Sequence, residues 1–119
     1  MALSKGGRVT AVEAATQTLI TEFGEYKAAV ANVIPPQKAG RAAVLAGAVD
    51  QTGWCPIDPV SFESKTSPNV HVVGDATIAG GMPKSAFAAN AQAKVCAAAV
   101  VDLLAGRTPA QPKLSLIHI

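Results

Sequence analysis

The chain has 119 residues, of which 50% are hydrophobic and 15% are charged, and its formal net charge is +2. This balance excludes a disordered chain, and the lack of a basic stripe argues against nucleic acid or a membrane surface as a partner. Much of the hydrophobic fraction is alanine and only 4% of residues are aromatic, so an independent core would bury little area. The composition suits a layer that packs closely against further polypeptide or against a cofactor.

Several features are missing from the sequence. No apolar run approaches the length of a membrane span, and the N-terminus lacks the hydrophobic region of a signal peptide. The two cysteines, Cys55 and Cys96, form no CxxC pair and no His/Cys cluster, so a metal site has no support. No GxGxxG occurs, so the usual pyrophosphate-binding turn of a dinucleotide fold is missing from this chain.

The first third of the chain predicts a β hairpin or meander. Residues 8–14 and 16–23 read as short strands, and we expect a turn at Gly24-Glu25 before a further extended segment. Within that segment, residues 28–34 are expected to be the most buried piece. Pro35-Pro36 then ends the strand pattern, because proline cannot donate to a ladder.

The middle of the chain predicts a short helix and then an irregular stretch. Residues 38–48 are small and apolar, and the helix is expected to end near Gly47. Residues 50–67 are rich in glycine and proline and include Trp54, the sole tryptophan, beside Cys55. A loop with these two residues is more typical of a site than of a linker.

The most informative stretch is 69–85. Residues 70–73 predict a short buried strand, Gly74-Asp75 a turn, and residues 79–81 a glycine loop. Pro83 predicts the first position of a helix. An acidic side chain at a strand tip can hold a sugar-like hydroxyl, and free N–H groups at a helix start face negative charge. The pattern therefore predicts the edge of a site for a large polar cofactor, and it favours a flavin.

The last helix is expected to run from Pro83 to about Ala105, with Gly106 as its C-cap. Alanine and valine occupy nearly all of its faces, and few polar residues follow Lys94. A helix of this kind is predicted to be largely buried.

Three segments in the same order resemble one family: 32–40 (Asn-Val-Ile-Pro-Pro-Gln-Lys-Ala-Gly), 53–59 (Gly-Trp-Cys-Pro-Ile-Asp-Pro) and 72–85 (Val-Val-Gly-Asp-Ala-Thr-Ile-Ala-Gly-Gly-Met-Pro-Lys-Ser). They are similar to the flavoprotein subunit of flavocytochrome c sulfide dehydrogenase, a relative of the sulfide:quinone oxidoreductases and the disulfide-reductase flavoproteins. The likeness covers roughly residues 6–115. It corresponds to the C-terminal third to half of such a subunit.

The resemblance implies an α/β fragment of a flavoprotein with two dinucleotide-binding domains. Residues 1–49 would be the end of the central, NAD-type domain and the return to the FAD domain. Residues 50–107 would be the C-terminal part of the FAD-binding domain, and 108–119 an exit segment. We expect the last four residues, 116–119, to be a non-native tail, since they depart from the family's pattern.

The resemblance also assigns FAD contacts. The Asp75 carboxylate would accept hydrogen bonds from the ribityl chain, and Gly74 would let the cofactor approach the backbone. Pro83, Lys84 and Ser85 would face the pyrimidine edge of the flavin from the helix start. The simpler alternatives stay open: Asp75 as a turn or helix cap, Pro83 as ordinary helix initiation, and Lys84 as a solvated charge.

By the same resemblance, Cys55 is one half of a redox disulfide beside the flavin ring, with its partner outside this chain. Sulfide would attack that disulfide to form a persulfide, and the released thiolate would pass two electrons to the flavin. Cys96 lies in the middle of the alanine-rich helix and reads as inert packing. Cys55 could also be purely structural, Trp54 a cover or a packing anchor, and His71 a satisfied core or edge histidine.

The implied activity is oxidation of sulfide to persulfide or sulfur. Electrons would pass from FAD to a c-type cytochrome subunit in the periplasm. A quinone acceptor is the nearest alternative. A different class of function, a non-catalytic structural or interaction module, also stays open, and we expect the fragment to be inactive on its own.

Overall fold

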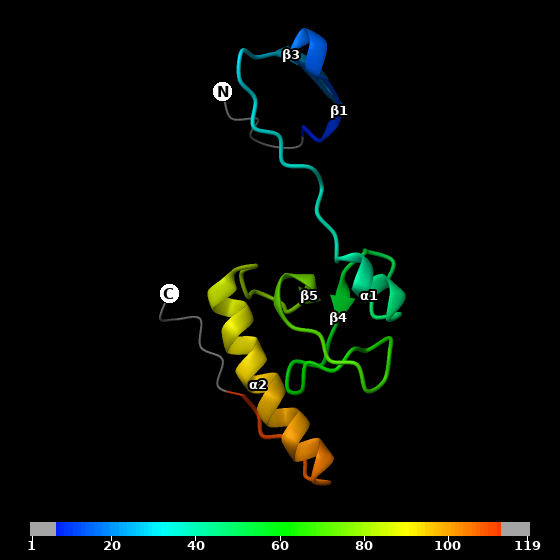
Figure 1. Cartoon of the computed structure of the whole chain (residues 1–119), viewed down its shortest axis with the longest axis vertical. Helices are drawn as coiled ribbons and strands as arrows, with labels where there is room; N and C mark the ends of the chain where they lie inside the picture. Colours follow the sequence, from blue (N-terminus) through cyan, green and yellow to red (C-terminus); the bar gives the residue numbers. More distant parts are fainter. Residues whose placement is uncertain (1–6, 113–119) are drawn as a thin grey trace. The chain divides into compact units, whose positions relative to one another are not determined.

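The computed structural model describes residues 7–112, which belong to two compact units that divide between Gln37 and Lys38 (Figure 1). Small sheets and helices occur together, as the predicted mixed α/β class requires. The expected non-native tail, 116–119, lies outside the described residues.

The first unit is a three-stranded antiparallel meander, which confirms the predicted topology. Its strands are β1 (Val9–Glu13), β2 (Thr18–Thr21) and β3 (Gly24–Lys27), in the order β1-β2-β3, with a 3-10 turn, η1 (Ala14–Thr16), between the first two. The predicted turn at Gly24-Glu25 is wrong by two residues, since Gly24 already pairs with Thr21. The Thr21 hydroxyl accepts a hydrogen bond from the Phe23 N–H at 3.2 Å and thereby stabilises the tighter turn.

Burial in this unit centres on β2 and not on residues 28–34. Thr18 and Thr21 of β2 are buried, whereas Val30 and Ile34 are exposed. The prediction for 28–34 is therefore wrong. The physical reason is that β2 has a hydrogen-bonded strand on each side, while residues 30–34 pair with no strand within 7–37.

The second unit contains two helices and a very short parallel strand pair. The helix α1 (Arg41–Leu45) is followed by Gly47 at φ +67°, which confirms the predicted short helix and its end. The strands β4 (Cys55–Pro56) and β5 (Thr77–Ile78) pair in parallel, and a 3-10 turn, η2 (Gly74–Ala76), precedes β5. The long helix α2 (Ala86–Leu104) packs against η2. The stretch 50–67 is irregular apart from β4 and isolated bridges, as predicted.

Small side chains form the core of the second unit. Ala39, Ala48 and Cys55 are buried together, and partly buried residues from α1 and the loops pack around them. Backbone bonds fix this layer: the Ala39 N–H donates to the Gly53 carbonyl at 2.9 Å, and the Asp50 N–H donates to the Trp54 carbonyl at 2.9 Å. Small side chains allow such close approach of backbones, but each buries little apolar area.

Residues 70–73 do not form the predicted strand. His71 makes only an isolated bridge to Glu63, and the Val72 N–H donates to the Phe62 carbonyl at 2.9 Å. The strand that belongs to the pair is β5, which follows the Gly-Asp turn instead of preceding it. The ring Nδ1 of His71 lies 2.9 Å from the Ser61 carbonyl oxygen, so this histidine is satisfied, as expected.

The helix α2 begins later than the sequence predicts. Ser85 is the N-cap, at φ −152°, and its hydroxyl accepts a hydrogen bond from the Ala88 N–H at 3.2 Å. Pro83 therefore lies before the helix, and its predicted place as the first helical residue is wrong. The far end lies within one residue of the prediction: the helix ends at Leu104, its C-cap is Ala105 and not Gly106, and Gly106 follows at φ +69°.

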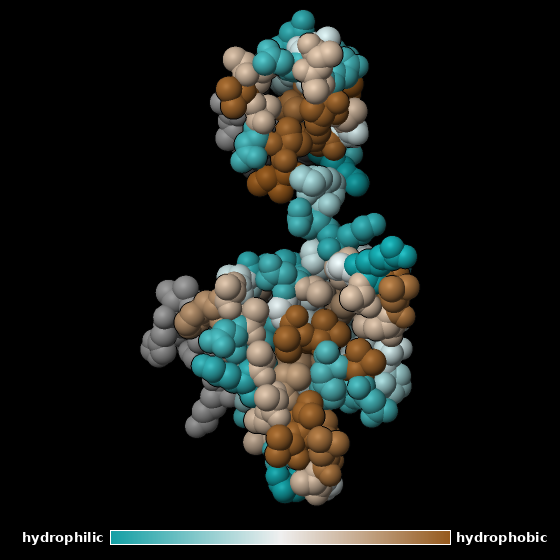
Figure 2. Space-filling model, in the orientation of Figure 1, coloured by the Kyte–Doolittle hydropathy of each residue, from teal (hydrophilic) through white to brown (hydrophobic). Residues whose placement is uncertain are grey.

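Contrary to prediction, α2 is mostly exposed within its unit. Its buried residues are Ala88, Gln92 and Ala99. Leu104 is 85% exposed, and apolar side chains gather at this end of the helix in Figure 2. The remainder of the unit is too small to cover more than one narrow face of a 19-residue helix.

By length and composition alone, α2 could also cross a membrane, although the sequence analysis found no apolar run of that length. Length and composition are weak evidence for a membrane span, because core helices of soluble proteins have the same length and composition.

The buried face of α2 gives a first testable prediction. Gln92 is 2% exposed, and its side-chain oxygen accepts a hydrogen bond from the Gly74 N–H at 2.7 Å. Replacement by leucine leaves that N–H without its acceptor, which typically costs about 1–3 kcal/mol. We expect Gln92→Leu to lower the midpoint of urea unfolding of this unit. Asn90→Leu, at an exposed position of the same helix, is the matched control, and equal midpoints for both variants would contradict the role of Gln92.

Candidate functional site

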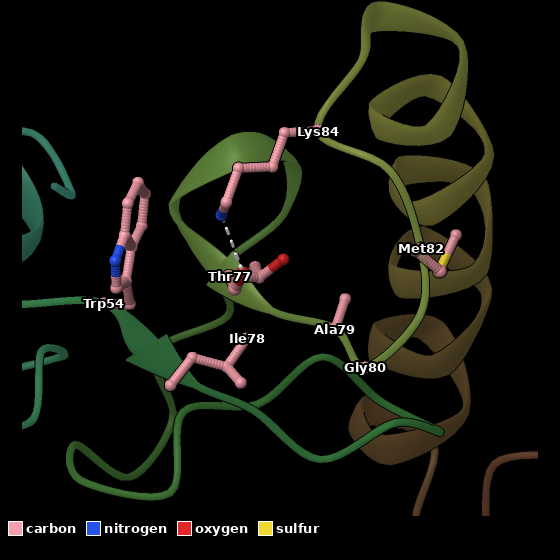
Figure 3. Close-up of a pocket in the computed structure, with 7 residues that line it drawn as sticks. All are labelled: Trp54, Thr77, Ile78, Ala79, Gly80, Met82 and Lys84. Atoms are coloured by element: carbon pink, nitrogen blue, oxygen red, sulfur yellow. Dashed lines mark hydrogen bonds between the residues drawn. The ribbon is translucent and has the colours of Figure 1, made fainter. Parts of the chain in front are cut away.

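The β4–β5 pair brings together two of the segments singled out in the sequence. Cys55 is in register with Thr77, and Pro56 with Ile78, so segment 53–59 lies directly beside segment 72–85. Next to this pair is a hollow of about 200 Å³, called the groove below. Seven residues line the groove, and Figure 3 shows them: Trp54, Thr77, Ile78, Ala79, Gly80, Met82 and Lys84.

The size of the groove limits what it can hold. Sites that enclose a drug-sized ligand usually measure about 300–1,000 Å³. At about 200 Å³, the groove can hold one edge of a large cofactor but not the whole molecule. A second hollow of about 290 Å³ shares Ile78, Ala79, Gly80 and Met82 with it and continues toward Phe62 and Lys65. The loop from Ile78 to Met82 is thus accessible from two sides.

Gly74 and Asp75 form the turn before β5. Gly74 has φ +81°, and an added Cβ would lie 3.5 Å from the Cβ of Ala89, an ordinary contact. Glycine is therefore needed here for the left-handed backbone and not for lack of space. The Asp75 side chain is exposed, caps neither η2 nor α2, and makes no hydrogen bond within residues 7–112. Its carboxylate is available to a ligand.

Lys84 is held at the rim of the groove, so it is more than a solvated charge. Its ammonium lies 3.7 Å from the centroid of the Trp54 ring. It also donates to the Thr77 carbonyl at 3.3 Å and to the Asp75 carbonyl. Ser85, the next residue, uses its hydroxyl to cap α2, and Pro83 is exposed and lines no part of the groove.

Cys55 does not face the groove. Its side chain is 0% exposed and lies in the alanine core, whereas the preceding residue, Trp54, is only partly buried against that core and also lines the groove. Neighbouring residues of an extended chain point to opposite sides, which explains the difference. Burial raises the pKa of the Cys55 thiol, Asp50 raises it further, and Lys84 partly opposes both. Cys55 and Cys96 are both free thiols.

The structure thus unites the predicted site residues only in part. Gly74 and Asp75 form the turn before β5, Lys84 donates to the Asp75 carbonyl, and Trp54, the residue before β4, contacts Lys84. The Cys55 sulfur lies on the other face of the strand.

Gln92 is a site residue that the sequence analysis missed. Besides its bond to Gly74, its side-chain nitrogen lies 3.7 Å from the Met82 sulfur, so it contacts both ends of segment 74–82, which includes β5 and the groove loop. The available signal was its spacing of four from Ala88, which places an amide on the same helix face as a buried alanine. That signal becomes readable only when the buried face of the helix is known.

The described residues indicate no metal site, and the comparison with protein families indicates no function for the groove. Among residues 7–112, no three His, Cys, Asp or Glu side chains lie close enough to hold a metal ion. No family model matches the chain. An assignment must therefore come from the groove's own residues and from the sequence motifs.

The burial of Cys55 predicts a pH dependence of stability. Since folding raises the thiol pKa above its ordinary value of 9.0, the folded state favours the neutral thiol. This stabilising contribution is complete below the unfolded pKa and is lost as the pH rises through the folded pKa. We expect the free energy of unfolding to fall above about pH 9 less steeply after Cys55→Ala. Both proteins should carry Cys96→Ala, because burial also raises the pKa of Cys96. Identical slopes would show that Cys55 is not buried in solution.

Proposed function

We propose that residues 38–112 form the flavin-ring side of an FAD site in a sulfide-oxidising flavoprotein related to flavocytochrome c sulfide dehydrogenase. In the intact enzyme, electrons would leave through a c-type cytochrome subunit in the periplasm. A quinone would be the alternative acceptor.

One observation carries this proposal. The Trp-Cys-Pro segment and the Gly-Asp…Pro-Lys-Ser segment are separate in sequence, and the parallel β4–β5 pair joins them. Trp54 of the first segment and Lys84 of the second both line the groove, where the Trp54 ring and the Lys84 ammonium meet. Two motifs that resemble the same cofactor site are thus adjacent, and this supports a shared ligand.

The residues present fit a flavin edge. The Trp54 ring offers an aromatic face for a planar ring. The Lys84 ammonium can donate to the polar edge of such a ring, and the exposed Asp75 carboxylate can accept from a hydroxyl of the ribityl chain. When bound, FAD would supply the two-electron acceptor that sulfide oxidation needs.

In this proposal Cys55 takes part in the sulfide chemistry through a disulfide with a cysteine outside this chain. Hydrosulfide would attack one sulfur, the S–S bond would break, and the other sulfur would leave as a thiolate. The product is a persulfide. This role requires the Cys55 sulfur to become exposed, because in the described unit it is packed against Ala39 and Ala48.

That burial favours a second candidate function, a non-catalytic interaction module. A fully covered thiol with a raised pKa is a poor nucleophile. The exposed apolar end of α2 also suits a protein–protein contact.

The Asp75 carboxylate gives the sharpest test of the two candidates. A hydrogen bond to a charged group contributes about 1.5–3 kcal/mol, so Asp75→Asn should weaken FAD binding by about ten- to a hundredfold. Equilibrium dialysis of the purified chain against FAD measures the dissociation constant directly. Circular dichroism of each variant checks that the fold is unchanged.

Asp102→Asn is the matched control. Asp102 is a partly buried carboxylate of the same unit, and it pairs with Arg107 at the far end of α2, at 2.8 Å. FAD binding that is equally strong in both variants would refute the assigned role of Asp75. No binding by the unsubstituted chain would favour the interaction module.

A further inference from the structure

The Lys84 side chain reaches back across the groove from the segment before α2. In Figure 3 its amine points from the rim toward Thr77, on the side of the groove where the Trp54 ring lies. Three groups hold the ammonium: the Trp54 ring at 3.7 Å, the Thr77 carbonyl at 3.3 Å and the Asp75 carbonyl. Trp54 lies just before β4, whereas Asp75 and Thr77 belong to the turn before β5 and to β5 itself.

This contact occupies a surface that a planar ligand would need. The groove lies between Trp54 and the loop that ends at Met82, so a ring that stacks on Trp54 would meet the Lys84 ammonium first. Lys84 is exposed, and cation–π contacts at exposed positions are weak. The side chain is therefore held in place but can be displaced.

The charge of Lys84 shows which ligands could displace it. Within residues 7–112, Lys84 has no carboxylate partner, and the ion pair found there joins Arg107 to Asp102. The ammonium is balanced only by carbonyl dipoles and an aromatic face. An anionic acceptor forms a stronger, charge-assisted hydrogen bond than a neutral carbonyl does.

We propose that Lys84 is a latch that covers Trp54 and that a planar ring with an anionic edge draws it away. Stacking on Trp54 and pairing with Lys84 then occur in one step, so the latch selects anionic rings over neutral rings. The identity of the ring rests on the proposed flavin function, whereas the cover over Trp54 is a property of the chain itself.

The cover can be tested without a ligand, because Trp54 is the sole tryptophan. Quenching of its fluorescence by iodide, an anion, is compared with quenching by neutral acrylamide. A unit charge about 4 Å from the ring enriches iodide there about two- to fivefold in water. We expect Lys84→Ala to lower the ratio of iodide to acrylamide quenching by about that factor.

Two control variants test whether the change in quenching comes from the Lys84 charge beside Trp54 and not from the loss of any lysine. Lys94→Ala removes an exposed lysine of α2 and should leave the ratio unchanged. Lys84→Arg should keep it, because a guanidinium also stacks on an aromatic face. A ratio in Lys84→Ala that equals the unsubstituted value would overturn the latch.

The second part of the proposal, the displacement of Lys84 from Trp54 by an anionic ring (the release step), needs a ligand as probe. Lumiflavin, a flavin ring without ribityl chain or ADP, is neutral when oxidised and anionic after two-electron reduction. Anaerobic equilibrium dialysis of both forms should show tighter binding of the anionic ring to the unsubstituted chain and loss of that preference in Lys84→Ala. The same preference in both proteins would overturn the selection by Lys84. Absence of binding in both would overturn the proposed function and the release step, while the quenching ratio would still decide whether Lys84 covers Trp54.

Discussion

The amide of Gln92 joins the long helix to the loop that forms the groove. It accepts a hydrogen bond from the Gly74 N–H at the start of segment 74–82, which includes this loop, and approaches the Met82 sulfur at its end. Alanine-lined surfaces provide few large side chains that could fix the position of a helix by shape, so a directional hydrogen bond has a larger share in doing so. Lys84 holds the same loop from the rim, through the carbonyls of Asp75 and Thr77. Two polar side chains, Gln92 of α2 and Lys84 of the segment before α2, thus hold the segment around the groove.

The sequence predicted some local features of the fold correctly, and it predicted burial poorly. Turn and cap residues such as Gly47 and Gly106 act within a few positions of the chain, and each directly follows the C-cap of its helix. Burial depends on what covers a segment, and hydrophobic pattern alone does not contain that information. The alanine-rich helix α2 was expected to be buried, yet its unit covers only one narrow face. Pro83 was misplaced because Ser85 offers a capping hydroxyl two residues later.

The difference between local features and features that depend on distant contacts also applies to the candidate site. Two segments singled out by their motifs become neighbours, because strand pairing between Cys55 and Thr77 joins them. The direction of each side chain was not predictable, since a shift of one residue along an extended strand reverses the face. Trp54 therefore lines the groove, while Cys55 packs in the core. Gln92 was missed because its role requires a contact between residues far apart in sequence.

The parallel pairing of β4 with β5 has a consequence for the order in which the protein assembles. Its two short strands are connected by the whole stretch between residues 56 and 77, whereas the meander and α2 depend on near neighbours. Closing such a long loop costs conformational entropy before the distant contacts form. We therefore expect this strand pair to form late in folding and to separate early in unfolding. Regions of low local stability gain most from a bound partner. A molecule that enters the groove would thus help to complete the surface that receives it.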